Sequence, residues 1–356
     1  MYKLISRILQ VLVSRAYDEA FFKPFSIKES SFEPPFEEMY KHLFHNSSEL
    51  PPKDNHEQLI VEEIELLMID LGQLNLSEFD RKECKQQIAK AAQEWGLFQV
   101  VGHGISKDIL DKIRLEQINL FRKPFHEKIN SEKLSSLAGN YIWGTPSATC
   151  LGQLSWIESF HIPLGDFLSS TNLTSLSSTI GQLSMEMFEL ANLLAKILDK
   201  KLGHHKPNFF EESCSPFNCY LRMNRYPPCP MPRGMFGLVP HTDSNFLTIL
   251  LQDHQIGGLQ FVKDGKWATV KLNSESLIVI IGDLFQHRSK FPMGLRYAVV
   301  AKCNCCKLRY PQQQGHKHCG DLLLAELSWW RDGPPLMVSE REEIREKDKE
   351  KKGIRV

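Results

Sequence analysis

CYLRMNRY at residues 219–226 opens the stretch that decides the fold, because from here apolar and polar side chains alternate with a period of two. A strand with one buried face produces this alternation. Lys263-Asp264-Gly265 predicts a hairpin turn further along. Four more segments of the strand type follow the first, separated by turn residues: NFLTILLQ (245–252), GGLQFV (257–262), KWATVKL (266–272) and SLIVIIGD (276–283). Several short strands in series predict a sandwich or jelly roll.

The region before this stretch predicts strands that alternate with helices. A buried strand is expected around residues 66–71, and LFQVV at 97–101 is expected to be a second one. Between them, Ser77 is a plausible helix cap and Gly96 supplies the stop. The N-terminal portion is therefore expected to be of the α/β type.

Two further helices are expected before residue 219. One begins at Ser106 and is closed by Pro124. The other carries a leucine and methionine stripe from Leu183 to Ile197 and ends at Gly203. Because that stripe lasts only about two heptads, it favours core packing over a coiled-coil partner site. The expected architecture is helical support followed by a β-barrel-like fold.

The composition of the chain is that of a soluble globular protein. It has 356 residues, of which 42% are apolar and 24% charged. Lys plus Arg and Asp plus Glu both number 43, so the net charge is zero, and neither nucleic acid nor a membrane surface is an expected partner. No apolar run reaches the ~18 residues of a membrane-spanning helix. Local sites must therefore indicate the function.

The nine cysteines bear on the cellular compartment. Their odd number, with no secretory signal, argues against a disulfide scaffold and indicates a reducing compartment, for which we expect a cytoplasmic location. Residues 1–16 carry Lys3, Arg7 and Arg15 without an acid and have an apolar face. They are an organelle-targeting helix, an ordinary N-terminal helix or an extension from a wrong start site.

The strongest chemical signal is VPHTDS at residues 239–244, at the start of a predicted strand. Residues two apart in a strand point to the same face, so His241 and Asp243 are expected to converge inside the β-structure. An imidazole and a carboxylate suit Fe(II), and one more histidine would complete a facial triad with three open coordination positions. A hydrogen-bonded surface pair is the structural alternative.

A second polar group lies just upstream. NRYPPCP at 224–230 follows an alternating strand that places Arg222, Asn224 and Tyr226 on one face. Together with GLVPHTDSNFLTILLQD, GGLQFVKDGKWATVK and LIVIIGD, this order of motifs resembles the plant iron(II)- and 2-oxoglutarate-dependent dioxygenases.

The resemblance extends to the N-terminal half. LMIDLGQL and WGLFQVVGHGIS look like the N-terminal domain of the superfamily. YIWGTPSATCLGQLSWIESFHIPL (141–164) and PPFEEMYKHLF (34–44) are similar to the gibberellin 2-oxidases that act on twenty-carbon gibberellins. The resemblance covers roughly residues 33–286.

The resemblance implies an α+β fold: a double-stranded β-helix (jelly-roll) core, a helical and α/β N-terminal portion, and an irregular C-terminal tail. The expected divisions are a variable lead-in (1–60), the dioxygenase N-terminal domain (61–175), the Fe(II)/2-oxoglutarate dioxygenase core (176–286) and a divergent C-terminal segment with a charged tail (287–356).

The resemblance also implies the chemistry. His241 and Asp243 would be iron ligands, and Tyr226, with Asn224 beside it, would bind 2-oxoglutarate. The family's reaction decarboxylates 2-oxoglutarate to succinate and carbon dioxide, consumes dioxygen and hydroxylates a small molecule, with ascorbate stimulating the enzyme. For a gibberellin-like diterpenoid the implied product is the 2β-hydroxylated, inactivated hormone.

Three aromatic residues are candidates for a hydrophobic substrate wall: Trp143, Trp156 and Phe160. The alternative is that all three belong to the core.

The chain departs from the family pattern after IGDLFQ at 281–286. In one alignment, His287 is the third iron ligand and Arg296 pairs with the far carboxylate of 2-oxoglutarate, after a deletion before His287. In the other, homology stops near Gln286 and both matches are accidental. Ala298 stands where the family has a serine. The alternative function is therefore a catalytically impaired or inactive dioxygenase-like binding protein without an intact distal iron ligand.

A cluster of soft ligands follows in the divergent segment. It holds six candidate metal ligands within seventeen residues: Cys303, Cys305, Cys306, His316, His318 and Cys319. These side chains could form a zinc site, although the spacing matches no common zinc finger.

Overall fold

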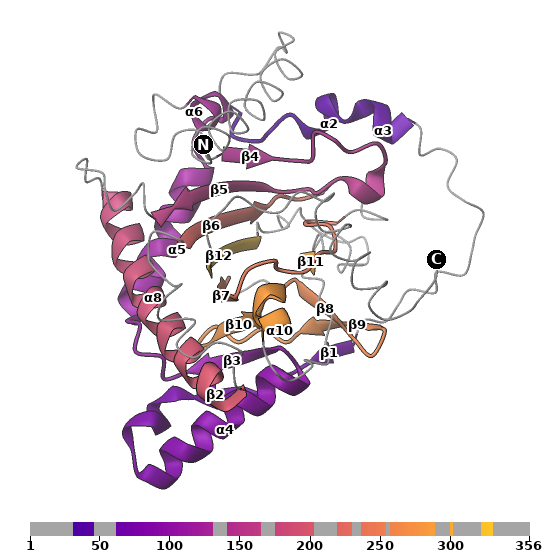
Figure 1. The fold of residues 1–356 in the computed structure, drawn as a ribbon. Helices are drawn as coiled ribbons and strands as arrows, with labels where there is room; N and C mark the ends of the chain where they lie inside the picture. The colour runs from indigo at the N-terminus through magenta and orange to yellow at the C-terminus, as the bar shows by residue number, and fades with distance from the viewer. Residues whose placement is uncertain are drawn as a thin grey trace, which may run out of the picture. The chain divides into compact units, whose positions relative to one another are not determined.

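The computed structural model describes residues 31–45, 62–130, 141–164, 175–202, 219–229, 236–253, 257–288, 300–301 and 322–329. All of them lie in one compact unit, Ser26–Trp329. Figure 1 shows two sheets and, beyond the larger one, a layer of helices. Among the described residues, no helix is long and apolar enough to cross a membrane.

The larger sheet has strands in the order β2 (Met68–Asp70), β3 (Leu97–Val101), β10 (Leu277–Ile281), β7 (Leu247–Gln252), β12 (Leu322–Trp329), β6 (Cys219–Tyr226), β5 (Glu158–Pro163) and β4 (Tyr141–Trp143). The smaller sheet has the order β1 (Glu62–Ile64), β9 (Lys266–Val270), β8 (Leu259–Lys263) and β11 (Val300–Ala301). Most neighbouring pairs are antiparallel; β2 with β3 and β1 with β9 are parallel.

The helical elements in chain order are α2 (Phe36–Met39), α3 (Lys41–His45), η2 (Leu71–Asn75), α4 (Glu78–Glu94), α5 (Lys107–Phe121), α6 (Phe125–Ile129), η3 (Leu151–Gln153), α8 (Ser175–Leu202) and α10 (Asp283–Arg288). Helix α8 packs against both α4 and α5. These three helices cover one face of the larger sheet (Figure 1).

Strand β10 shows why the layers form. Its residues Leu277, Val279 and Ile281 belong to the apolar core under the helices, whereas Ile278 and Ile280 belong to the core between the two sheets. A strand buried on both faces is apolar throughout, and this accounts for the run LIVII. Polar residues of β6 and β7 also face the interior between the sheets, because they alternate with residues of the core under the helices.

Local sequence signals are confirmed at several element ends. Ser77 caps α4 in a reciprocal capping box with Asp80, and Ser106 caps α5. Asp264 and Gly265 have positive φ angles of 52° and 76°, as a two-residue turn between antiparallel strands requires.

The C-terminal segment contains a strand that its sequence does not predict. Strand β12 lies between β6 and β7 and pairs antiparallel with both. It therefore occupies the centre of the larger sheet. Without β12, β6 and β7 would each have an unpaired edge there. The rest of residues 287–356, apart from His287 to Arg288 and β11, lies outside the described residues.

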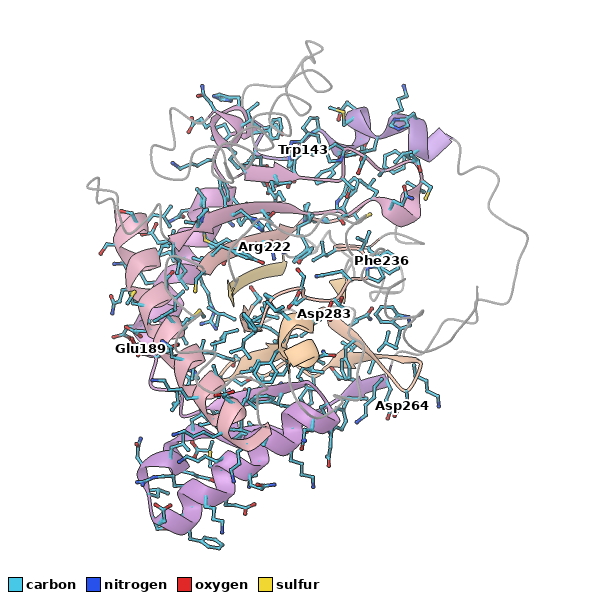
Figure 2. The ribbon with its side chains drawn as sticks, in the orientation of Figure 1. Trp143, Glu189, Arg222, Phe236, Asp264 and Asp283 are labelled. Atoms are coloured by element: carbon cyan, nitrogen blue, oxygen red, sulfur yellow. The ribbon has the colours of Figure 1, made fainter. Side chains whose placement is uncertain are left out.

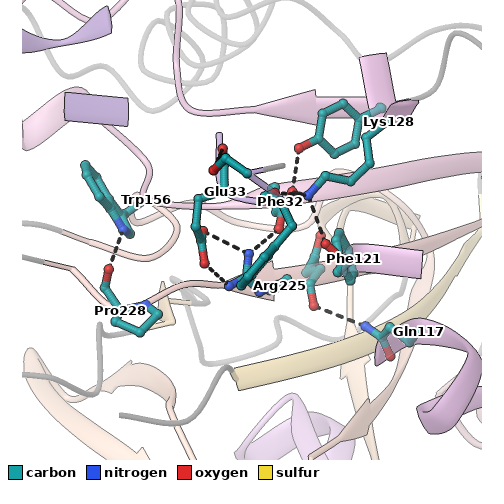
Figure 3. Close-up of polar contacts among 12 residues, drawn as sticks. Phe32, Glu33, Gln117, Phe121, Lys128, Trp156, Arg225 and Pro228 are labelled. Carbon is teal, nitrogen blue, oxygen red and sulfur yellow. Dashed lines mark hydrogen bonds and ion pairs between the residues drawn. The ribbon is translucent and has the colours of Figure 1, made fainter. Parts of the chain in front are cut away.

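A buried cluster of charges ties β5 and β6 to the N-terminal segment (Figure 3). Glu158 is fully buried and accepts hydrogen bonds from Lys128 (2.6 Å), Arg225 (2.5 Å) and the Tyr141 hydroxyl. Arg225 also pairs with Glu33 at 2.5 and 3.1 Å. Burial lowers the pKa of Lys128 more than the charge of Glu158 raises it. We call these five residues the Glu158 cluster.

We expect Glu158→Gln to lower the free energy of unfolding by about 3–5 kcal/mol, because it leaves two buried cations beside a neutral amide. Urea denaturation followed by circular dichroism measures the change. The control is Glu94→Gln, which removes an exposed pair with Lys90 at 4.0 Å and should cost less than about 1 kcal/mol. Equal losses in the two variants would contradict the structural role of Glu158.

The stability should also depend on alkaline pH through Tyr141. Burial, and then the charge and hydrogen bond of Glu158, raises the pKa of Tyr141 well above its ordinary value of 10.0. The folded protein therefore retains a proton that the unfolded chain releases, so this stabilisation is complete below about pH 10 and is lost as the pH rises toward the folded-state pKa. We expect unfolding free energy to fall more steeply above pH 10 in the wild type than in Tyr141→Phe. Parallel slopes would show that Tyr141 does not carry the effect.

Candidate metal and cosubstrate site

His241 and Asp243 lie together, although not for the reason that their spacing predicts. Residues 241–244 lie before β7 and are not part of a strand. The Nε2 atom of His241 lies 3.6 Å from Oδ1 of Asp243, and the two side chains are 23% and 16% exposed. Two atoms that each lie about 2 Å from one metal ion can be at most about 4 Å apart, so this pair can share an ion. The two side chains are partly buried rather than fully solvated.

The ring of His241 is oriented by its own backbone. Its Nδ1 atom lies 2.9 Å from the carbonyl oxygen of Val239. Because a carbonyl oxygen only accepts hydrogen bonds, Nδ1 carries the proton in the neutral ring and Nε2 keeps its lone pair. The nitrogen that is free to bind a metal is therefore the one beside Asp243.

Asp243 is held by β7 and by the start of α10. The hydroxyl of Thr248 donates to Oδ2 of Asp243 at 2.8 Å. The backbone N–H of Asp283 donates to the carbonyl oxygen of Asp243 at 2.7 Å, and the hydroxyl of Thr242 donates to the Asp283 carboxylate at 2.7 Å. Figure 2 labels Asp283 at the first turn of α10. This leaves Oδ1 of Asp243 to face His241.

The charges of the pair favour a bound cation. Burial lowers the pKa of His241. The hydrogen bond to Asp243 and the charge of Asp243 together raise this pKa by more than burial lowers it, so the pKa lies above its ordinary value. Burial raises the pKa of Asp243, but His241 and the hydroxyl of Thr248 lower it to below the ordinary value. The pair thus attracts a proton, and a metal cation can take the place of that proton.

Two residues just before β5, Ser155 and Trp156, position the segment that carries His241. The N–H of Val239 donates to the hydroxyl of Ser155 at 3.2 Å, and the N–H of Trp156 donates to the carbonyl oxygen of Phe236 at 2.9 Å. The indole of Trp156 donates to the carbonyl oxygen of Pro228 at 3.2 Å (Figure 3). The predicted site did not include Ser155, since no local motif marks a residue that acts through a distant backbone.

The predicted face of β6 forms as expected. Cys219, Leu221 and Met223 point into the core under the helices, so the alternate residues Arg222, Asn224 and Tyr226 face the interior between the sheets. Tyr226 belongs to the apolar core of that interior.

Asn224 is 1% exposed, and neither its amide nitrogen nor its amide oxygen has a partner in the structure. A buried amide without partners is costly, and a cosubstrate carboxylate would accept a hydrogen bond from its nitrogen. The donor set therefore fits 2-oxoglutarate, while His241 and Asp243 fit two ligands of Fe(II).

The structure does not show the other predicted site residues next to His241 and Asp243. The backbone of His287 lies in α10, the helix whose first residue contacts Asp243. Arg296 and the cluster from Cys303 to Cys319 lie outside the described residues. Among the residues that the structure describes, no group of three or more His, Cys, Asp or Glu side chains could hold a metal ion.

The proposed substrate wall is wrong, because the three aromatic residues are core residues. Trp143 and Trp156 are 5% and 4% exposed and pack against Phe36 of α2, with ring centroids 5.2 and 4.2 Å apart. Phe160 lies in the core under the helices, 5.4 Å from the ring of Phe121. Figure 2 labels Trp143 on β4, at the edge of the larger sheet.

Two family models match this chain. Residues 66–166 match the N-terminal domain described as non-haem dioxygenase in morphine synthesis, and residues 217–299 match the 2OG-Fe(II) oxygenase superfamily. The first range lies in the N-terminal portion of the chain, and the second contains most strands of the β-rich core.

Curated relatives are similar over most of the chain. The chain is 50% identical to gibberellin 2-beta-dioxygenase 8 of Arabidopsis thaliana over 264 residues, 71% of this chain and 76% of the relative. It is 41% identical to gibberellin 2-beta-dioxygenase 5 of Oryza sativa subsp. japonica, over 72% of this chain and 74% of the relative. More distantly, 1-aminocyclopropane-1-carboxylate oxidase homolog 1 of Arabidopsis thaliana is 33% identical over 61% of this chain and 60% of that protein.

The fold agrees with solved oxygenase structures. The crystal structure of JOX2 in complex with 2OG, Fe and JA aligns with a TM-score of 0.57 and 22% identity, over 88% of this chain and 82% of that one. The crystal structure of the dioxygenase for auxin oxidation in rice aligns with a TM-score of 0.55 and 20% identity, over 74% of this chain and 83% of that one. The predicted α+β class with a jelly-roll core is confirmed.

Gly282 allows α10 to approach the metal pair, and this generates a prediction. A Cβ atom at this position would lie 2.0 Å from the carbonyl oxygen of Asn245. We expect Gly282→Ala to displace the segment that holds Asp243, to cost about 1–3 kcal/mol of stability and to weaken Co(II) binding about 10- to 100-fold. Calorimetric titration measures the affinity. Gly152→Ala is the control, since its Cβ would meet only the Cys150 sulfur at 4.0 Å; Co(II) affinity equal in both variants would contradict the prediction.

Proposed function

Since the chain belongs to the iron(II)- and 2-oxoglutarate-dependent oxygenase family, we propose that it hydroxylates a twenty-carbon gibberellin at the 2β position and so inactivates the hormone. The observation that carries the proposal is the pair of His241 and Asp243, 3.6 Å apart inside the barrel, on the same interior as the partnerless amide of Asn224. The gibberellin assignment is supported by the similarity to the two gibberellin 2-beta-dioxygenases. Cytoplasmic location is part of the same proposal.

The residues of this chain have distinct roles in the proposed reaction. His241 Nε2 and Asp243 Oδ1 hold the iron, and His287 is proposed as the third ligand. Asn224 and Tyr226 bind 2-oxoglutarate, and Arg296 is proposed to pair with its far carboxylate.

Iron with 2-oxoglutarate and dioxygen supplies the oxidation: one oxygen atom enters the substrate C–H bond as hydroxyl, the other enters succinate, and carbon dioxide leaves. The Val239 carbonyl keeps the His241 ring in the required tautomer.

The test is turnover by the purified full chain. The protein is incubated with Fe(II), 2-oxoglutarate, ascorbate and a twenty-carbon gibberellin, and mass spectrometry measures succinate and the 2β-hydroxylated product. We expect His241→Ala to lower turnover by more than about 100-fold, because even loss of a group that only orients a metal ligand costs 10- to 100-fold. His42→Ala, on the exposed side of α3, is the control. Turnover that His241→Ala leaves unchanged would refute the iron site.

The same assay tests the third ligand. We expect His287→Ala to reduce turnover to the level of His241→Ala, since both would leave the iron with two protein ligands. If His287→Ala is as active as the wild type, the alignment that makes it a ligand is wrong.

A catalytically impaired binding protein is the second candidate. The observation that favours it is that the described residues bring no third metal-binding side chain to His241 and Asp243. Such a protein would produce neither succinate nor product and would bind Fe(II) weakly in the presence of 2-oxoglutarate. Tight iron binding with product formation excludes it.

A further inference from the structure

Strands β6 and β7 carry two buried amide side chains that face the interior between the sheets. Ile249 and Leu251 of β7 belong to the core under the helices, whereas Leu250 belongs to the core between the sheets. Because side chains alternate along a strand, Gln252 shares the face of Leu250. Asn224 of β6 faces the same interior, and Gln252 and Asn224 are 3% and 1% exposed.

The two amides stand in one row across the larger sheet. Strand β12 lies between β6 and β7 (Figure 1). Its residue Leu324 stands opposite Asn224 in one register and opposite Gln252 in the other. The backbones that carry the two amides are therefore two strand spacings apart, about 10 Å at ~4.8 Å per spacing. Amides that lean in from both sides can contact one ligand group between them.

Neither amide is satisfied by the part of the protein that the structure describes. Nε2 of Gln252 and both polar side-chain atoms of Asn224 are buried without a hydrogen-bond partner there. A buried donor without an acceptor is costly, and most buried amides in folded proteins are paired. Gln260 of β8 is also 3% exposed, but its Nε2 donates to the hydroxyl of Thr269 at 3.1 Å. The unpaired row therefore indicates a ligand that accepts hydrogen bonds.

The row lies along β7 from the metal pair. Thr248, whose hydroxyl donates to Asp243, is four residues before Gln252 and on the same face, about 13 Å away at ~3.3 Å per residue. A metal–oxygen bond of about 2 Å, a five-carbon chain and a hydrogen bond of about 2.9 Å together cover a gap of this order. A ligand with one end on the metal thus meets the row with its other end. Tyr226, which is assigned to 2-oxoglutarate, is the next residue after Asn224 on that face of β6.

We propose that Gln252 binds the far carboxylate of 2-oxoglutarate through its amide N–H, with Asn224 donating from the other side of the row. This deepens the proposed function and rests on it. An ionised carboxylate has about four lone pairs that accept hydrogen bonds, and a bidentate arginine, the role proposed for Arg296, takes two of them. The two amides supply donors for the others in a buried site.

The test compares two oxo acids that differ only at the far end. 2-Oxopentanoate has the oxo acid end and the carbon chain of 2-oxoglutarate, and a methyl group replaces the far carboxylate. The full chain is loaded with Fe(II) without dioxygen, and calorimetric titration gives the affinity for each acid. Gln252→Met keeps the length of the side chain and removes the amide. Gln260→Met is the matched control, because Gln260 alternates with Leu259 and Phe261 and so faces away from the interior.

We expect Gln252→Met to weaken binding of 2-oxoglutarate about 10- to 100-fold and to leave 2-oxopentanoate unchanged, since only the first acid has a charged acceptor at the far end. Asn224→Leu should show the same selective loss. Gln252→Asn, which shortens the side chain but keeps the amide, should retain part of the affinity. Gln260→Met should bind both acids as the wild type does.

Urea unfolding of the protein without metal and oxo acid separates ligand binding from packing. An amide without a partner adds no hydrogen bond to the fold, so Gln252→Met should keep or raise the unfolding midpoint. Gln260→Met loses the bond to Thr269 and should lower it. Midpoints lowered equally in both variants would assign Gln252 a structural role and count against the proposal.

Two binding results would overturn the proposal: equal affinities of wild type and Gln252→Met for 2-oxoglutarate, or equal weakening of both oxo acids, which indicates lost packing. A chain that shows the selective loss but forms no hydroxylated gibberellin supports the role of Gln252 and contradicts the gibberellin assignment. Wild-type protein that binds neither oxo acid contradicts both proposals.

Discussion

The burial of Glu158 is the constraint on which the candidate site depends. A carboxylate with no exposure must be paired, and its partners come from three separate places: Lys128 after α5, Tyr141 on β4 and Arg225 on β6. These bonds can form only when β5 and β6 stand in one register. A shift of one residue would leave buried charges without partners and would turn every side chain of the strand to the opposite face.

That register decides which groups meet in the interior. Because Glu158 and Glu33 hold Arg225 on the face of β6 away from the interior between the sheets, Arg222 and Asn224 face that interior, on the side of His241 and Asp243. The same strands thus carry a paired, structural set of charges on one face and the proposed ligand-binding groups on the other.

Sequence patterns identify features that depend on neighbours in the chain. The strand of residues 219–226, the capping serines and the Asp264-Gly265 turn were predictable, because alternation, capping and positive φ act within a few residues. Strand β12 was not, because its partners lie far earlier in the chain and its own run has no clear period. The closeness of His241 and Asp243 was predicted from a strand pleat, yet bonds to Thr248 and Asp283 produce it.

By itself, the sequence determined the family, the order of the strands along the chain and the residue types that can bind iron and 2-oxoglutarate, because these are properties of local pattern and of motif order. Only the tertiary structure decided that Trp143 and Trp156 are core residues, that Ser155 supports the backbone before His241, and that Arg225 pairs with the buried Glu158. The physical reason is that burial and charge pairing are set by the residues that folding brings together, and these lie far apart in the chain.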